Sequence, residues 1–285
     1  MASLHPDWLV PDWPVPPHIR SVFTTRAGGV SQRPYDSLNL GHPSLDDPAA
    51  LDTNRARLQA ALGASPVYVS QVHGVHTVEL AAEQCSGAVA LEADGVVSAA
   101  PGVVCTMRVA DCLPVLLTDN RGLVVAAAHA GWRGLAHGVL ERNFACFETL
   151  VRNQSPPPSL SQPQQAREAR EALQVATVAQ NTLAWLGPCI GPQAFEVGSE
   201  VRDAFLAADA TVAPCFAPTA GGKWLADLAA LARVRLRTLG VTRVYGNDSS
   251  RQWCTASNPS RFFSHRRDSV LWGGSGRMAA CIWIG

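Results

Sequence analysis

The sequence predicts a single-domain α+β protein in which helices pack against layered β-sheets. Apolar, β-rich runs alternate with amphipathic helical patterns along the chain, and this interleaving indicates layers that share a core. Several neighbouring runs are joined by short turns, as in hairpins, which favours mixed, largely antiparallel sheets over a doubly wound parallel sheet. Apolar strands recur from residue 21 to the end of the 285 residues, so we expect one domain spanning 1–285.

The first elements are an irregular arm, a strand and a helix. Residues 1–20 are rich in Pro and Trp and are expected to pack without regular structure. Residues 21–31 form a β-branched run that ends in two glycines, which predicts a strand followed by a turn. Residues 46–63 are predicted to be a helix, because they begin with two Asp residues suited to capping, continue with Pro48 and end at Gly63.

A strand and a long hairpin follow in the middle of the chain. Residues 66–74 are predicted to be a strand, and residues 102–117 a longer β-rich stretch. Pro114 inside that stretch predicts a sheet edge, a bulge or a break. The turn DNRG at 119–122 then leads into a returning strand at 123–131.

The second half of the chain again contains predicted helices and strands, with one insertion between them. Apolar residues at helical spacing predict a helix over about 134–150. Residues 152–180 are dominated by Ser, Pro and Gln and are expected to form an exposed insertion. The remaining predicted elements are a strand in 182–191, helices at 198–208 and 223–240, and strands at 241–246 and 278–285.

Composition excludes several classes of function. The formal net charge is zero and the chain has no basic run, so binding to nucleic acid or to an anionic membrane surface is not expected. No apolar stretch reaches the roughly 18 residues that a transmembrane helix requires. The eight cysteines are scattered without a CxxC motif, which favours free thiols and a cytoplasmic location. The sequence has no signal for a particular oligomeric state.

Three metal-ligating side chains stand where packing alone would favour aliphatic residues. His73, Cys112 and His129 lie at or near the ends of apolar strands, and such ends open into loops where side chains can converge. Cys112 and His129 are 17 residues apart across a short turn, so they can lie side by side on neighbouring strands. Two imidazoles and one thiolate suit zinc or copper, and three protein ligands leave a coordination position open for catalysis.

Two other interpretations of the same residues stay open at this stage. Cys112 can be a core residue while the two histidines are hydrogen-bonded within the fold. Alternatively, the thiolate of Cys112 can act as a nucleophile with a histidine as its base. Asp111 could then orient the imidazole, although strand alternation would point it away from Cys112.

Polar residues in the flanking motifs are candidates for substrate binding. In HAGWRG, residues 129–134, Arg133 lies where a helix is expected to begin and could hold a phosphate. Arg26 and Asn39 lie among turn formers and could contact a substrate, although such an Asn more often stabilises its own turn. The pair Arg266–Arg267 follows two Phe residues and could line a substrate entrance, although the two Phe more often form an aromatic anchor beside solvated charges.

Several of these motifs together resemble one family. They are FTTRAGGVS, YDSLNLG, QVHG, ADG, ADCLPVLL, AAAHAGWRGLAHGVLE, LGPCIGPQAFEVG and FFSHRRD with GRM. Their order resembles the laccase-domain, or multicopper polyphenol oxidase-like, family, whose bacterial members are also called peptidoglycan editing factor and purine nucleoside phosphorylase. The resemblance covers about residues 10–285.

The resemblance implies a fold, a cofactor and an activity. It implies an α/β/β/α layered sandwich, and zinc, or copper in some preparations, bound by His73, Cys112 and His129. It implies phosphate-dependent cleavage of adenosine, inosine and S-methyl-5′-thioadenosine, with adenosine deaminase activity beside it, so that the partners are a nucleoside and phosphate. Two alternatives are an amidase that edits UDP-MurNAc-L-Ser in peptidoglycan precursor synthesis and a copper-dependent phenol oxidase.

Overall fold

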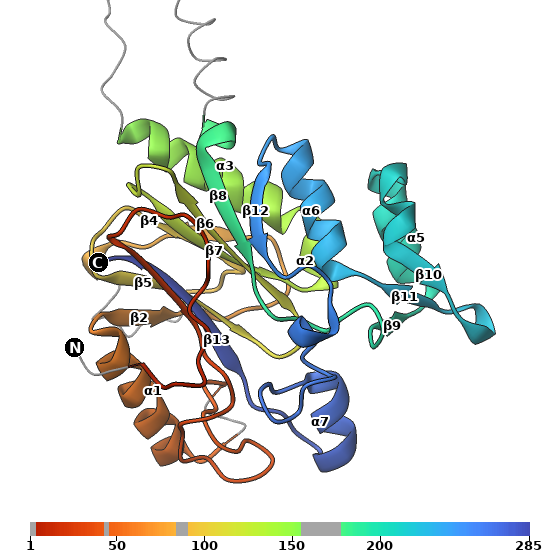
Figure 1. Ribbon diagram of the computed structural model, residues 1–285, viewed down its shortest axis with the longest axis horizontal. Coiled ribbons are helices and arrows are strands. Elements are labelled where there is room, and N and C mark those ends of the chain that lie inside the picture. Colours follow the sequence, from red (N-terminus) through yellow and green to blue (C-terminus); the bar gives the residue numbers. More distant parts are fainter. Residues whose placement is uncertain (1–3, 43–45, 84–90, 155–177) are drawn as a thin grey trace, which may run out of the picture.

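Two β-sheets packed face to face form the centre of the protein (Figure 1). The computed structural model describes residues 4–42, 46–83, 91–154 and 178–285. The first sheet has the strand order β1-β13-β5-β2, with β1 (Ile19–Phe23), β13 (Met278–Ile284), β5 (Val103–Val109) and β2 (Ser65–Tyr68). The second sheet has the order β12-β8-β6-β7-β4-β3, with β12 (Arg243–Gly246), β8 (Thr182–Leu186), β6 (Leu113–Asp119), β7 (Val125–Ala130), β4 (Gly95–Ser98) and β3 (Thr77–Glu79).

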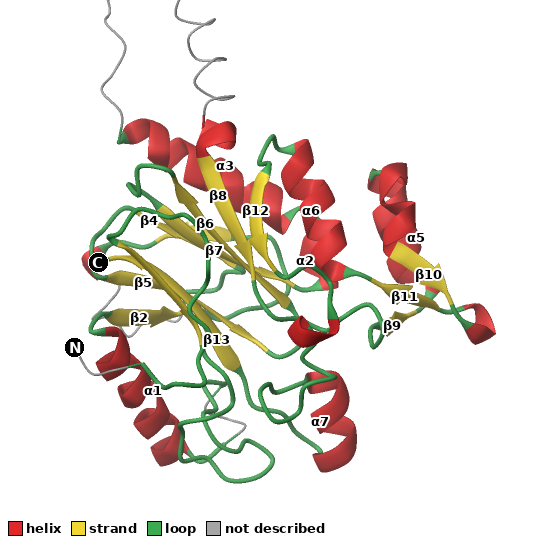
Figure 2. Ribbon diagram, in the orientation of Figure 1, coloured by secondary structure: helices red, strands yellow, loops and turns green. Residues whose placement is uncertain are grey.

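Helices cover the two outer faces of this pair of sheets (Figure 2). On one side α1 (Pro48–Leu62) packs against the first sheet. The helices beside the second sheet are α2 (Trp132–Ala136), α3 (Val139–Asn153) and α6 (Leu228–Thr238). The helix α5 (Ser199–Ala208) lies farther out and packs against α2 and residues 224–226. This order of layers is the predicted α/β/β/α sandwich, and most strand pairs in it are antiparallel.

Smaller elements complete one end of the sandwich. A three-stranded sheet of order β10-β11-β9 lies beside α5, with β9 (Glu196–Val197), β10 (Phe216–Pro218) and β11 (Trp224–Ala226). Short 3-10 turns occur at 210–215, 220–222 and 251–253, and α7 (His265–Trp272) precedes β13. None of the described helices is long and apolar enough to span a membrane.

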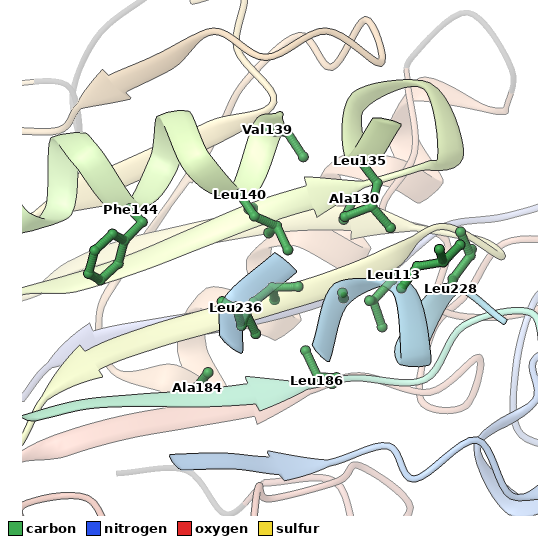
Figure 3. Packing of buried hydrophobic residues seen from close by; sticks show 14 of the residues in the cluster. Leu113, Ala130, Leu135, Val139, Leu140, Phe144, Ala184, Leu186, Leu228 and Leu236 are labelled. Atoms are coloured by element: carbon green, nitrogen blue, oxygen red, sulfur yellow. The ribbon is translucent and has the colours of Figure 1, made fainter. Parts of the chain in front are cut away.

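Three apolar cores lie between the four layers, and alternating strand residues enter different cores. Leu116 of β6 packs between the sheets, whereas Val115 and Leu117 pack beneath the helices. Ala280 of β13 likewise faces the second sheet, whereas Cys281 faces α1. Because successive side chains of a strand point to opposite faces, strands buried on both faces are apolar throughout. Figure 3 shows the core beneath the helices.

The helix caps agree with the sequence prediction at α1. Asp47 accepts a hydrogen bond from the backbone N–H of Ala49, and Gly63 ends the helix in the left-handed conformation at φ 63°. These contacts satisfy backbone groups that a helix end would otherwise leave unpaired.

Several predicted elements are divided differently in the structure. The stretch 102–117 forms two strands, because the chain turns at Asp111 with φ 87°. Pro114 therefore lies near the start of the central strand β6 and not at a sheet edge. The helix predicted at 134–150 is two helices, since Gly138 adopts φ 94° between them. The strand predicted at 66–74 ends at Tyr68.

In the C-terminal half, the observed elements also differ from the predicted ones. The helix predicted at 223–240 begins at Leu228, because Asp227 caps it by accepting a hydrogen bond from the N–H of Ala230. Residues 224–226 belong to strand β11 instead. Most of the insertion predicted at 152–180 lies outside the described residues.

Candidate functional site

The predicted ligand trio comes together at one end of the two sheets. The donor atoms of His73, Cys112 and His129 all lie within 4.8 Å of one another. His129 is in β7, opposite Pro114 of β6, and Cys112 directly precedes β6. His73 lies in the loop after β2 with φ 62°, and its ring is 4.8 Å from that of His129. The fold therefore unites three segments that are far apart in sequence.

A glycine leaves the space that this cluster occupies. A Cβ atom at Gly131 would lie 2.9 Å from the Sγ of Cys112 and 3.0 Å from the Cδ2 of His73. Real Cβ atoms essentially never approach another atom as closely as 2.9 Å, and a 3.0 Å contact is tighter than nine in ten. Gly131 in the HAGWRG motif is therefore required by the packing of the cluster.

Asp94, which directly precedes β4, orients two of the three candidate ligands. Its carboxylate is fully buried and accepts a hydrogen bond from the Nδ1–H of His129 at 2.7 Å. It also accepts the backbone N–H groups of Val72, His73 and Gly74, at 3.1, 3.0 and 2.7 Å. One carboxylate thus holds the His73 loop and directs the Nε2 of His129 towards the cluster, as carboxylates do behind metal-bound histidines.

The electrostatic environment favours a thiolate at Cys112. Burial opposes ionisation of this thiol, but the neighbouring imidazoles of His129 and His73 outweigh burial and lower the pKa of Cys112. Burial also opposes charge on His129, yet Cys112 and Asp94 raise the pKa of His129 above its ordinary value. The thiolate is the form of cysteine that binds metals.

These residues fit a metal ion in number and in kind. Zinc forms bonds of about 2.0–2.3 Å to imidazole nitrogen and thiolate sulfur, so donor atoms within 4.8 Å of one another lie close to the spacing that a shared ion requires. Three protein ligands with one open position are the pattern of catalytic rather than structural zinc sites. Among the described residues, this is the one cluster of three or more such ligands.

The cluster opens into a cavity of about 590 Å³. Its apolar lining consists of Trp132, Ile190, Phe195 and Leu228. Its basic lining consists of Arg108, Arg266 and Arg277, together with the imidazoles of His42 and His265. A cavity of this size and mixed lining suits a small ligand that combines a flat apolar group with an anionic one.

Two residues predicted to bind substrate hold the N-terminal loops instead. The guanidinium of Arg26 donates to the carbonyls of Asp36 and Pro259 at 2.9 and 2.8 Å. The buried Asn39 uses its Oδ1 to accept the N–H of Arg277 and its Nδ2 to bind Asp46. Neither residue is part of the cavity lining.

Arg133 and Asp111 have surroundings that the sequence prediction did not include. Arg133 is exposed in the first turn of α2, which begins at Trp132, two residues before the predicted start at about Gly134. Its guanidinium stacks 4.4 Å from the centre of the Trp132 ring, and it does not line the cavity. Asp111 lines the cavity, and its carboxylate accepts hydrogen bonds from Thr255, Ser264 and the N–H of Arg266 and not from His73 or His129.

The residues of the FFSHRRD motif have different surroundings in the structure. Arg266 lines the cavity, and Phe262 and Phe263 are fully buried. Arg267 points elsewhere, donating to the carbonyls of Thr255 and Phe262.

Sequence reasoning missed four residues around the cavity. Gln71 of the QVHG motif accepts the N–H of Arg108 and donates to its carbonyl, both at 2.9 Å, which fixes the loop to β5. Arg108 is a single charge in an apolar strand, and Arg277 directly precedes another. Asp94 belongs to the ADG motif. A lone charged residue in or beside a buried strand was the signal available for Asp94, Arg108 and Arg277.

Comparison with known proteins places the chain in a family. The family model described as multi-copper polyphenol oxidoreductase laccase matches residues 20–156 and 165–285. The chain belongs to this family. Purine nucleoside phosphorylase PA4543 of Pseudomonas aeruginosa is 46% identical over 278 residues, 97% of this chain and 98% of the relative. Purine nucleoside phosphorylase YfiH of Escherichia coli is 44% identical over 278 residues, with the same coverage of each chain.

Two solved structures share the fold of this chain. Protein NMB0706 of Neisseria meningitidis has a TM-score of 0.80 and 41% sequence identity, covering 98% of this chain and 99% of that one. YlmD from Geobacillus stearothermophilus has a TM-score of 0.73 and 27% identity, covering 94% and 92% of the two chains.

Proposed function

We propose that the protein is a metal-dependent purine nucleoside phosphorylase that acts on adenosine, inosine and S-methyl-5′-thioadenosine. The observation that carries the proposal is the convergence of His73, Cys112 and His129 on a cavity of about 590 Å³ with apolar and cationic walls. The names of relatives 44–46% identical over almost the whole chain support the same reaction class.

The reaction requires an anion, a purine and a proton donor in one pocket. An oxygen of phosphate forms a bond to C1′ of the ribose, and the bond from C1′ to the purine nitrogen breaks. The electron pair of that bond leaves with the purine, which takes up a proton, so the products are the free base and ribose 1-phosphate. The chain offers Trp132 and Phe195 to pack against the base, and guanidinium groups to bind phosphate.

His73, Cys112 and His129 would hold the metal, which we propose to be zinc, with copper possible. A bound zinc supplies a Lewis acid that polarises an oxygen or nitrogen of the substrate or of water. Asp94 keeps the His129 imidazole in the tautomer that leaves Nε2 free for the metal. The same cluster supports a second proposed activity, replacement of the 6-amino group of adenosine by water to give inosine and ammonia.

In the direct test, purified protein is incubated with adenosine or inosine, with and without phosphate. We expect adenine or hypoxanthine together with ribose 1-phosphate only when phosphate is present, and inosine from adenosine without it. A chelator and the variant Cys112→Ala should abolish both reactions, and zinc should restore only the chelated wild type. The control Cys146→Ala changes a half-buried cysteine of α3 that is not part of the cavity lining. Base release that survives both chelation and Cys112→Ala would reject the proposal.

Two other activities predict different results in the same assay. An amidase for UDP-MurNAc-L-Ser would release serine from that precursor and leave nucleosides unchanged. Mass spectrometry of the products distinguishes this amidase from the phosphorylase. Phenol oxidation at copper is less well supported, because reducing dioxygen to water takes four electrons while a single copper site transfers one at a time. The described residues offer a single converging cluster of three or more ligands.

We also propose a cytoplasmic location. All seven cysteines among the described residues are free thiols, which suits a reducing compartment.

A further inference from the structure

Two arginines stand side by side on the first sheet where it borders the cavity. Arg108 on β5 is opposite Ala279 of β13, and Arg277 precedes Ala279 by two residues. Because residues two apart on a strand share a face, both side chains project from the α1 side of the sheet. Both line the same cavity as the ligand trio.

Each guanidinium is held by backbone carbonyls and keeps donors for a ligand. Arg108 donates from one terminal nitrogen to the carbonyl of Val69 at 2.7 Å. Arg277 donates from one terminal nitrogen to the carbonyls of Ser275 and Gly276, at 2.7 and 3.1 Å. A guanidinium has five N–H donors, so each side chain is fixed in place with donors left over.

No carboxylate of the described residues forms an ion pair with either arginine. Burial, together with the positive charges of Arg55 and Arg277, lowers the pKa of Arg108 to about 10. Burial likewise lowers the pKa of Arg277. Arg55 adds a third positive charge nearby, and its buried Nε has no hydrogen-bond partner among the described residues. Cys112 and Asp111 lie near enough to Arg277 to oppose this lowering of its pKa, but neither forms an ion pair with it. Three partly buried positive charges with so little direct compensation are unfavourable, and a bound anion would relieve this.

We infer that Arg108 and Arg277 form the phosphate-binding subsite of the cavity. The shared chemistry is a phosphate group with two negative charges, which two planar guanidinium groups can bind through paired hydrogen bonds. That the anion is free phosphate rests on the proposed phosphorylase function; the diphosphate of a nucleotide-linked precursor is the other source of the same group. This subsite takes the role that the sequence suggested for Arg133, which is exposed, stacked on Trp132 and carried by a five-residue helix.

The test measures binding and does not depend on turnover. Inorganic phosphate is titrated calorimetrically into the zinc-loaded protein, and uridine diphosphate is titrated in a second arm. The variants are Arg277→Gln, Arg277→Lys and Arg108→Lys, each checked for a wild-type melting profile. Arg133→Gln tests the competing site, and Arg237→Gln, an exposed arginine of α6, is the matched control. Titration of Cys112→Ala separates binding by the arginines from binding to a metal.

We expect Arg277→Gln to weaken phosphate binding by about tenfold or more, as loss of charge-assisted hydrogen bonds implies. Arg277→Lys should recover part of that loss, and Cys112→Ala and Arg237→Gln should bind phosphate like the wild type. In turnover assays, KM for phosphate should rise while KM for the nucleoside stays near its wild-type value.

The outcomes separate this inference from the proposed function. Wild-type phosphate affinity in folded Arg277→Gln and Arg108→Lys, or a loss confined to Arg133→Gln, overturns the subsite. Failure of the wild type to bind either phosphate or uridine diphosphate also overturns it. If uridine diphosphate binds through these arginines and phosphate does not, the anion subsite holds and the phosphorylase proposal fails.

Discussion

Replacing Asp94 by Asn removes one charge and breaks two hydrogen bonds at the base of the metal cluster. Oδ1 of the carboxylate accepts from His129 and from the N–H of His73, and Oδ2 accepts from the N–H groups of Val72 and Gly74. An Asn amide has only one acceptor oxygen, so two N–H donors would face an NH₂ group instead. Because the side chain is fully buried, water cannot replace the lost partners.

Two quantities should change in Asp94→Asn. Each lost hydrogen bond to a charged acceptor is worth about 1.5–3 kcal/mol, so the free energy of unfolding of the metal-free protein should fall by about 3–6 kcal/mol. Zinc affinity should fall by about 10–100-fold, the usual effect of removing the partner of a metal-bound histidine. Urea unfolding in the presence of a chelator measures the first quantity, and competition with a chromogenic zinc chelator measures the second.

The matched control for Asp94→Asn is a substitution on the surface of α1. Asp52→Asn makes the same chemical change at an exposed position of α1, and both quantities should stay at their wild-type values. If folded Asp94→Asn binds zinc as tightly as the wild type, Asp94 does not orient the ligands and the assignment of the cluster to a metal loses its main structural support.

Three further substitutions test the site and the fold. Gly131→Ala should lower zinc affinity by about tenfold or more, because its Cβ would lie 2.9 Å from the Sγ of Cys112; wild-type affinity in the chelator competition would contradict this steric requirement. Leu58→Ala should lower the free energy of unfolding by about 2–5 kcal/mol, since Leu58 is fully buried, whereas Leu271→Ala, at a side chain 59% exposed, should change it by less than about 0.5 kcal/mol. Equal urea midpoints for the two leucine variants would contradict the predicted core. Asp227→Ala removes the cap of α6 and should cost about 1 kcal/mol in the same unfolding assay, with no change expected if the cap is dispensable.

Elements with strong local signals could be predicted from the sequence. The caps of α1 at Asp47 and Gly63 depend on neighbouring residues only, and the structure contains both. The hairpin of β6 and β7 follows from two apolar runs and a turn. The break at Gly138 was not predicted, and the break at Asp111 was predicted only as one of three possibilities at nearby Pro114, because a positive φ at one residue interrupts an apolar pattern without changing it.

The candidate site was only partly predictable for a related reason. His73, Cys112 and His129 differ in chemistry from their apolar neighbours, so they could be identified from the local sequence. Arg108 and Arg277 meet only because β13 pairs with β5 in one particular register. A shift of that register by one residue would send one set of side chains to the opposite face, and no local pattern in the sequence specifies the register.

Two buried carboxylates join the distant segments of the site. Asp94 binds groups 20–35 residues away along the chain, and Asp111 binds groups 144–155 residues away. Neither forms an ion pair with an arginine or lysine of the described residues, so their hydrogen bonds compensate for burial.

This arrangement couples the metal site to folding. The donor atoms of His73, Cys112 and His129 converge only after the two sheets have packed and Asp94 has closed the His73 loop, so the unfolded chain has no equivalent three-ligand site. An ion that binds the native state alone stabilises it by about 2.7 kcal/mol at a concentration one hundred times Kd. The residues that position the ligands therefore affect how much stability the metal adds, which is why Asp94→Asn should lower both stability and zinc affinity although Asp94 is not itself a ligand.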